Sequence, residues 1–280
     1  MTDLSKTATK GAIIIPAAME SEEVFGCRTT PLVKMDTGTT SIKCQIIHHE
    51  PGQTLAVHIH PHSDDIMLVF QGCGEAFLGD AWFEVGEGDV IFAPEGIRHG
   101  TRNRTGSDRE LVCYNWQVGM ALRNGALGAA PDQASEDQSR LATPADCLKE
   151  KTPPPASEGI ITNVEQGALF TGYGAEMRFV VWPKTGSHKM SLHKAIHPPG
   201  MAFREHSHPA SADMVLAFRG RGEGYCFDGW YPMNQGDLLL APRGVTHGTR
   251  HPGGGDPEPF ICVGVGVPPQ LDLYRAAGYL

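Results

Sequence analysis

Residues 58–65, HIHPHSDD, recur as residues 206–213, HSHPASAD, 148 positions later in the chain. Aligned at this offset, residues 49–102 match residues 197–250 at 24 of 54 positions with no gap. Unrelated segments of that length would match at roughly three positions, so the chain is a tandem duplication. Each copy is therefore expected to fold as the same structural unit.

Each copy contains three histidines and one aspartate at identical spacing. The first set is His58, His60, Asp65 and His99, and the second is His206, His208, Asp213 and His247. Imidazole nitrogens and carboxylate oxygens are ligands that first-row transition metals bind. In each His-x-His pair the two residues point the same way if the segment is a strand, because strand side chains alternate between faces. We therefore predict a divalent transition metal such as Fe, Mn, Ni or Zn, with two ions per chain if both copies bind one.

Short strands dominate both copies. Runs such as QTLAVHIH and DIMLVFQG are separated by turn residues at about ten-residue intervals, which predicts an all-β barrel or sandwich. We divide the chain into an N-terminal arm (1–24), a first domain (25–123), a linker (124–158) and a second domain (159–280). The linker ends in PPP at 153–155 and contains a candidate short helix from Ser135.

The repeated positions resemble the two motifs of the cupin family, G-x5-H-x-H-x(3,4)-E-x6-G and G-x5-P-x-G-x2-H-x3-N. The first copy matches them with Gly52, His58, His60, Asp65 and Gly72, then with Gly88, Pro94, Gly96, His99 and Asn103. The second copy matches with Gly200, His206, His208, Asp213 and Gly220, then with Gly236, Pro242, Gly244 and His247, and has His251 in place of Asn. The resemblance implies a bicupin, two tandem antiparallel jelly-roll barrels, each with a metal site.

Both copies have aspartate where the family motif has glutamate. Aspartate is one methylene shorter, so two roles stay open for Asp65 and Asp213. Either carboxylate ligates the metal directly, or it accepts a hydrogen bond next to the metal and transfers protons in catalysis.

Two further residues are candidates for substrate binding. Strand alternation would put Arg204 on the same face as His206, where its guanidinium would hold a substrate carboxylate; a bulge would instead turn it to the rim. His62 lies beside the first ligand set, as a proton shuttle or as an exposed turn residue.

Composition narrows the partners. The net charge of −9 gives no basic surface for nucleic acid and no attraction to anionic membranes. The seven cysteines show no Cys-x-x-Cys pairing and suggest buried thiols in a reducing compartment. No early apolar run is long enough for a signal peptide. We expect a cytoplasmic protein that binds a small, anionic molecule and forms a homodimer, since cupin modules pair through sheet faces.

Three functions remain open at this level. The first is a metal-dependent oxygenase or related oxidoreductase acting on a small organic acid or hydroxylated aromatic, as in the bicupin quercetinases, oxalate decarboxylases and ring-cleaving dioxygenases that the chain resembles. The second is a redox-neutral isomerase, lyase or hydrolase on a sugar or keto acid. The third is a non-catalytic metal or small-ligand binder.

Overall fold

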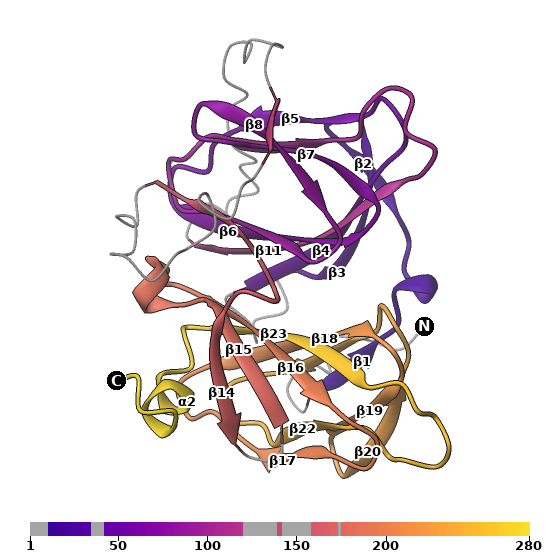
Figure 1. Cartoon of the computed structure of the whole chain (residues 1–280), viewed down its shortest axis with the longest axis vertical. Coiled ribbons are helices and arrows are strands. Elements are labelled where there is room, and N and C mark those ends of the chain that lie inside the picture. Colours follow the sequence, from indigo (N-terminus) through magenta and orange to yellow (C-terminus); the bar gives the residue numbers. More distant parts are fainter. Residues whose placement is uncertain (1–10, 35–41, 120–138, 142–157, 173–174) are drawn as a thin grey trace.

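The computed structural model describes residues 11–34, 42–119, 139–141, 158–172 and 175–280. Within these ranges the chain is built almost entirely of antiparallel strands that form two barrels, one above the other in Figure 1. This confirms the prediction of two tandem jelly-roll barrels of the cupin type.

Two sheets form the first barrel. The seven-stranded sheet has the order β13-β9-β6-β11-β4-β3-β2, and the five-stranded sheet the order β12-β8-β7-β10-β5. The strands are β2 (Glu22–Val24), β3 (Cys27–Val33), β4 (Ile42–His49), β5 (Thr54–His58), β6 (Ser63–Gln71), β7 (Cys73–Leu78), β8 (Ala81–Gly86), β9 (Asp89–Ala93), β10 (His99–Arg102), β11 (Leu111–Gly119), β12 (Ser139–Leu141) and β13 (Ile160–Asn163).

The second barrel repeats this plan. Its seven-stranded sheet has the order β1-β21-β18-β23-β16-β15-β14, and its four-stranded sheet the order β17-β22-β19-β20. The strands are β1 (Ala12–Ile14), β14 (Ala168–Gly172), β15 (Ala175–Val181), β16 (Ser191–His197), β17 (Ala202–His206), β18 (Ala212–Arg219), β19 (Gly222–Cys226), β20 (Gly229–Met233), β21 (Leu238–Ala241), β22 (His247–Arg250) and β23 (Phe260–Val267). The described helices are η1 (Pro16–Ala18), η4 (Pro183–Thr185) and α2 (Leu271–Ala276).

The largest apolar core lies between the barrels, because the two seven-stranded sheets pack against each other. Its buried side chains include Leu68 and Trp116 from the first barrel and Leu216 and Val263 from the second, all 0 % exposed. The Tyr114 hydroxyl adds a hydrogen bond of 2.6 Å to the Gly236 carbonyl oxygen across this contact. The central strands of these sheets, such as β6, β11, β18 and β23, bury both faces. One face packs against the other barrel, and the opposite face lines the barrel interior, where the predicted ligand residues lie.

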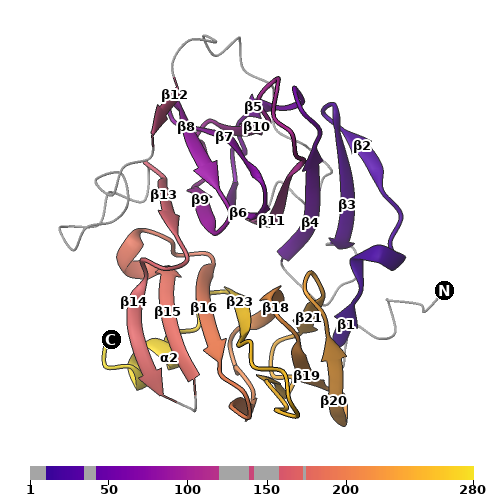
Figure 2. The same ribbon diagram turned by 45° about the vertical axis from the view of Figure 1, so that its right-hand side comes forward.

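The barrels exchange one strand each. Strand β1 pairs with β21 in the second barrel, with Ala12 opposite Leu240, and β13 pairs with β9 in the first barrel, with Ile160 opposite Phe92. These pairs differ by the repeat offset of 148 at both positions, so the exchange follows the same symmetry as the duplication (Figure 2). The domain boundaries expected at 24/25 and 158/159 follow the sequence repeat. Strand pairing crosses both boundaries, because β1 precedes the first and joins the second barrel, and β13 follows the second and joins the first barrel. Neither barrel is a continuous stretch of chain.

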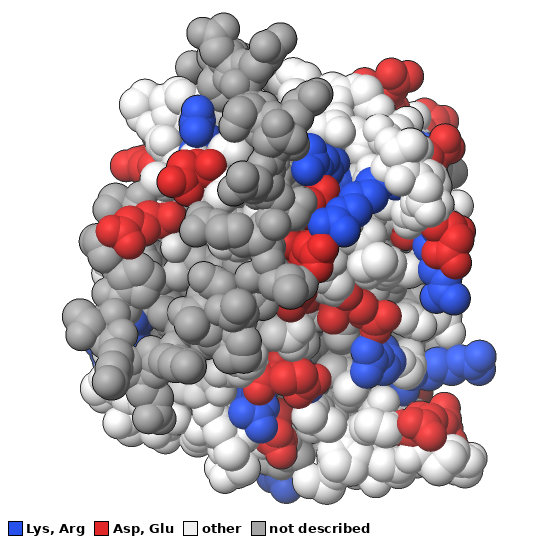
Figure 3. Space-filling view, turned by 45° about the horizontal axis from the view of Figure 1, so that its top comes forward, with Lys and Arg blue, Asp and Glu red and all other residues white. Residues whose placement is uncertain are grey.

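The structure bears on four further expectations: the linker, the cysteines, membrane-spanning segments and surface charge. Most of the predicted linker, including the candidate helix from Ser135, lies outside the described residues; within it, β12 pairs in parallel with β8. Of the six cysteines in the described ranges, five are buried and Cys73 is exposed. No helix in those ranges is long and apolar enough to cross a membrane. On the face shown in Figure 3, acidic and basic side chains are interspersed.

The exchanged strand β1 tests the contribution of this arrangement to stability. Ile14 is 3 % exposed in the core between the barrels, while the next residue, Ile15, is 53 % exposed. We expect Ile14→Ala to lower the free energy of unfolding by about 2–4 kcal/mol, because it leaves a cavity in a core that joins both barrels. Urea denaturation measures the change. The matched control Ile15→Ala is expected to stay within about 0.5 kcal/mol of wild type, and equal effects of the two variants would contradict the docking of β1.

Candidate metal centres

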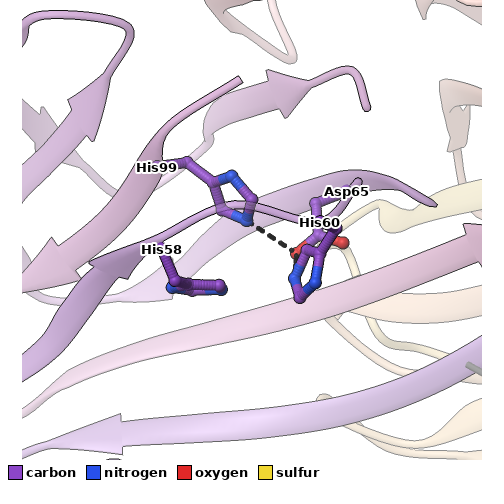
Figure 4. A group of neighbouring side chains, drawn as sticks. All are labelled: His58, His60, Asp65 and His99. Atoms are coloured by element: carbon purple, nitrogen blue, oxygen red, sulfur yellow. Dashed lines mark ion pairs between the residues drawn. The ribbon is translucent and has the colours of Figure 1, made fainter. Parts of the chain in front are cut away.

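The first predicted ligand set comes together inside the first barrel. His58 ends β5, His60 follows two residues later, Asp65 lies on β6 and His99 begins β10. One donor atom from each residue lies within 4.8 Å of the others, and all four side chains are buried (Figure 4). The strand register explains this convergence. His99 on β10 pairs directly with His58 on β5, and β6, in the opposite sheet, directs Asp65 into the same barrel interior.

Hydrogen bonds define which nitrogen of each imidazole faces the centre of this cluster. Nδ1 of His58 lies 2.7 Å from the Ala56 carbonyl oxygen, and Nδ1 of His99 lies 2.8 Å from that of Ile97. A carbonyl only accepts, so both Nδ1 atoms carry the proton and both Nε2 atoms present lone pairs. His99 Nε2 lies 3.3 Å from Oδ2 of Asp65. This buried contact needs either a proton on Nε2 or a metal ion between the two atoms, so the donor set fits a metal ion.

Asp65 is held by amide side chains from the neighbouring strand. Its Oδ2 accepts hydrogen bonds from Gln117 Nε2 at 3.0 Å and Asn115 Nδ2 at 3.1 Å, and Gln45 in turn donates to Asn115 at 3.0 Å. Its Oδ1 has no hydrogen-bond partner. Burial alone would raise the pKa of Asp65, but the charge of His60 and hydrogen bonds from His60 and His99 hold that pKa well below its usual value. Asp65 therefore stays ionised, as a metal ligand or a neighbour of one must.

The second cluster consists of His206, His208 and His247, whose donor atoms lie within 4.8 Å of one another. Nδ1 of His206 donates to the Arg204 carbonyl at 2.8 Å, and Nδ1 of His247 donates to the Val245 carbonyl at 2.9 Å. Nδ1 of His208 lies 2.8 Å from the Asp272 carboxylate and therefore also carries a proton.

In the neutral rings the Nε2 atoms of the second cluster are therefore available as lone-pair donors, and that of His247 also lies 3.2 Å from Oδ2 of Asp213. Nε2 of His206 and Nε2 of His208 are 3.2 Å apart, a distance that needs a proton or a metal ion between the two nitrogens. Burial, reinforced by the charge of His247, lowers the pKa of His206 to about 4, so this ring is neutral at pH 7 and able to bind a metal. The three imidazoles fit a metal ion in this barrel too.

Asp213 occupies a different position from Asp65. Its Oδ2 is 3.2 Å from His247 Nε2 but 4.0 Å from His208 Nε2, and it falls outside the set of donor atoms that lie within 4.8 Å of one another. Burial would raise its pKa, but a hydrogen bond from His247 and that residue's charge lower it. The structure therefore groups a carboxylate with three imidazoles in the first barrel, and groups three imidazoles alone in the second.

The strand beside each aspartate explains this difference. Gln117 pairs with Asp65, and Gly266 pairs with Asp213; Asn115 and Gly264 correspond in the same way. The second barrel therefore lacks both amides that hold Asp65. A Cβ atom at Gly264 would clash with the ring of His193, and one at Gly266 would lie 2.6 Å from Cδ of Gln270. These two side chains occupy the space that the amides occupy in the first barrel.

Helix α2 covers the second centre. Leu273 lines a cavity of about 20 Å³ next to His206, His208 and Asp213, a volume that holds about one water or ion. Outside it, a cavity of about 690 Å³ lies along β17 and is lined by His206, His208 and Asp272 among others. The inner cavity accommodates an ion, and only the outer cavity has room for an organic molecule.

The two predicted substrate residues lie outside the clusters. The register of β17 against β22 shifts between Phe203 and His206. As a result Phe203 is buried against His206, and Arg204 is exposed. Arg204 therefore does not point inward as simple alternation would have it, and instead lines the outer cavity. His62 is exposed in the turn before β6.

Sequence reasoning missed the residues that surround the ligands. Three of these residues are not repeated in the second barrel, so the alignment of the two copies did not single them out. They are Gln45, Asn115 and Gln117, whose counterparts are His193, Gly264 and Gly266. The alternating Asn115-x-Gln117 in an otherwise apolar strand was an available signal, because buried amides need partners. No sequence pattern indicated Asp272, because its contact with His208 depends on where the C-terminal helix α2 packs.

The fold and the paired histidine clusters define a two-barrel metal-binding protein. The model described as Cupin domain matches residues 45–114 and 193–264, slightly more than half of the chain, and the chain therefore belongs to the cupin family.

Comparison with solved structures finds the same fold. Ylba from E. coli, of the family model DUF861, superposes with a TM-score of 0.68 at 12 % identity, covering 93 % of this chain and 91 % of that one. The oxalate decarboxylase of Lactobacillus farciminis, in a formate complex, gives 0.65 at 13 % identity, covering 94 % and 89 %. A single-residue variant of the oxalate decarboxylase of Bacillus subtilis gives 0.64 at 12 %, covering 92 % and 77 %.

One curated relative is similar in sequence. Protein SchB of Streptomyces halstedii is 28 % identical over 83 residues, which is 30 % of this chain and 60 % of that protein.

Metal content of single-cluster variants tests both centres. We expect about two ions per chain in wild type and about one in His60→Ala and in His208→Ala, because each substitution removes one of three imidazoles from a single cluster. Elemental analysis of freshly purified protein gives the count. His62→Ala, next to the first cluster but exposed, is the matched control and is expected to keep both ions. Equal metal in all four proteins would contradict the assignment.

The carboxylate of Asp272 gives a second, sharper test. It holds the Nδ1 proton of His208 and thereby orients Nε2 toward the cluster, so Asp272→Ala is expected to weaken metal binding in the second barrel by about 10–100-fold. Competition titration with a chelator measures this affinity. Binding in the first barrel is the internal control and is expected to be unchanged. An unchanged second-barrel affinity would show that His208 needs no such orientation.

Proposed function

We propose that this protein is a metal-dependent enzyme that acts on a small organic acid or hydroxylated aromatic, with oxygenase or related oxidoreductase activity. The observation that carries the proposal is the convergence of three imidazoles on one point in each barrel, joined in the first by the ionised Asp65. Such a set leaves coordination positions for substrate, which is the arrangement of catalytic rather than structural sites.

His58, His60, His99 and Asp65 would hold the ion in the first barrel, and His206, His208 and His247 would hold it in the second. Fe, Mn, Ni and Zn all suit imidazole and carboxylate donors. A bound divalent ion supplies Lewis-acid and, for iron or manganese, redox chemistry toward substrate oxygens. The name of the similar oxalate decarboxylases supports a small acid as the substrate class.

The chain's own residues position this chemistry. Backbone carbonyls at Ala56 and Ile97 fix the ring orientations of His58 and His99, so the donor atoms are preorganised before substrate binds. The amides of Asn115 and Gln117 keep Asp65 in one rotamer and in its ionised form. Burial of all four ligands limits the access of bulk water to the reacting atoms.

The redox-neutral alternative gives Asp65 or Asp213 the role of proton carrier. Two amide donors bind Asp65 Oδ2, and such bonds stabilise the ionised form, so this carboxylate is a poor proton acceptor at neutral pH. This argues against a redox-neutral reaction in which Asp65 carries the proton; Asp213, which has no such amide donors, is the residue that would carry it in that alternative. For substrate binding in the second barrel we propose Arg204, from the wall of the outer cavity, as the carboxylate contact. For His62 we propose a contact at the entrance of the first barrel. We further propose that the protein acts as a cytoplasmic homodimer.

Oxygen consumption separates the two classes of reaction. With iron- or manganese-loaded protein and a panel of small carboxylic acids and hydroxylated aromatics, we expect uptake of dissolved oxygen to accompany loss of one substrate. His60→Ala, deprived of its first-barrel ion, is expected to lose at least about 100-fold of this rate. An oxygen electrode with product analysis measures both quantities. Turnover without oxygen uptake would favour the redox-neutral enzyme, and a metal-loaded protein without turnover would favour a binding protein.

A further inference from the structure

The interior of the first barrel contains a lysine that no ligand set includes. Lys43 lies on β4 directly opposite Gln117 on β11, and Gln117 lies directly opposite Asp65 on β6. Residues paired in this way share one face of the sheet, and neighbouring strands are about 4.8 Å apart. Lys43, Gln117 and Asp65 therefore form a row across three adjacent strands, and the row ends at the metal ligands.

The neighbours of Lys43 confirm which way its side chain points. Ile42 and Cys44 are 0 % exposed in the core between the barrels, so Lys43 points to the opposite face. Gln45, two residues further on that same face, donates a hydrogen bond to Asn115 in the barrel interior. The carboxylate of Asp65 and the ring of His60 also lie within electrostatic range of Lys43.

Lys43 is half-buried and has no ion-pair partner among the described residues. The carboxylates of Asp65 and Glu22 lie within electrostatic range of Lys43, but neither makes a direct ion pair with it. By contrast Lys194, 2 % exposed, binds Glu165 directly at 2.5 Å. Among the described residues, no direct partner therefore occupies the ammonium of Lys43 beside the metal-ligand cluster, and it can bind an incoming anion.

The second barrel lacks this feature at the same position. Ser191 is the counterpart of Lys43, because it pairs with Gly266, the counterpart of Gln117. The side chain of Gln270, 0 % exposed, packs over Gly266 and fills the space beside Ser191. In the first barrel the row of paired residues ends at the cation of Lys43. In the second barrel Gln270, from the C-terminal segment, fills the equivalent space.

We propose that Lys43 forms a carboxylate-binding subsite in the first barrel, next to the ion held by His58, His60 and His99. The subsite binds the carboxylate of a small organic acid through the ammonium group while the rest of the molecule faces the metal ligands. It gives the first barrel an anion-binding position inside the barrel, in addition to the outer-cavity contact proposed for Arg204 in the second barrel. This inference rests on the proposed function, because it places the substrate beside a metal ion.

The binding of formate, the smallest carboxylate, tests the subsite without any need for turnover. His208→Ala protein reconstituted with Co²⁺ contains the ion in the first barrel only, and its visible absorption reports anions that enter the site. We expect Lys43→Gln in this background to weaken formate binding by about tenfold or more through loss of the ammonium charge. Lys43→Arg keeps the charge and is expected to stay within about threefold.

Two controls keep the test specific. Lys184→Gln removes the same charge from an exposed position on the second barrel and is expected to leave formate binding unchanged. Formamide, which is neutral, is expected to bind equally to all variants. Absence of formate binding, or Lys43→Gln within twofold of its parent while the cobalt spectrum is intact, would overturn the subsite alone. Absence of cobalt from the first barrel would overturn the proposed function and the subsite together.

Discussion

Convergent lone pairs are the constraint around which both barrels are arranged. In five of the six rings Nδ1 donates a hydrogen bond to a backbone carbonyl or a carboxylate, which turns Nε2 toward the centre of the cluster. His206 and His208 approach to 3.2 Å in this way. Buried nitrogens at such distances need a shared proton or a bound ion between them. A metal ion bound there would therefore contribute to the stability of the barrel interior as well as to its chemistry.

The duplication gives the two centres a common scaffold, while the exchanged strands β1 and β13 join the barrels into one folding unit. Each barrel borrows its edge strand from the other half of the chain, and the core between the seven-stranded sheets is continuous across the contact. On this shared scaffold the centres have diverged. Amides surround the aspartate in the first barrel, whereas glycines, His193 and the C-terminal segment take their place in the second. The same set of residues is therefore held by different surroundings in the two barrels.

The sequence alone predicted the fold and the histidines that come together in each barrel, because both depend on short-range rules. His-x-His on a strand places two rings on one face, and the repeat supplied the third ring at a matched position. Arg204 shows where such rules stop: a bulge between Phe203 and His206 breaks the alternation and leaves the guanidinium exposed. The strand exchange was not predictable, since a three-residue apolar strand such as β1 fits the edge of either barrel. The contact of Asp272 with His208 depends on the docking of a helix 64 residues away, which no local pattern encodes.

The most direct test of this account is the anomalous diffraction of a crystal of the metal-loaded protein, recorded at the absorption edge of the bound metal. The account predicts two peaks per chain, each about 2.0–2.3 Å from the Nε2 atoms of its three histidines. It further predicts a carboxylate oxygen of Asp65 at the first ion or hydrogen-bonded beside it. Imidazoles that remain in these positions without any anomalous peak between them would contradict the central claim.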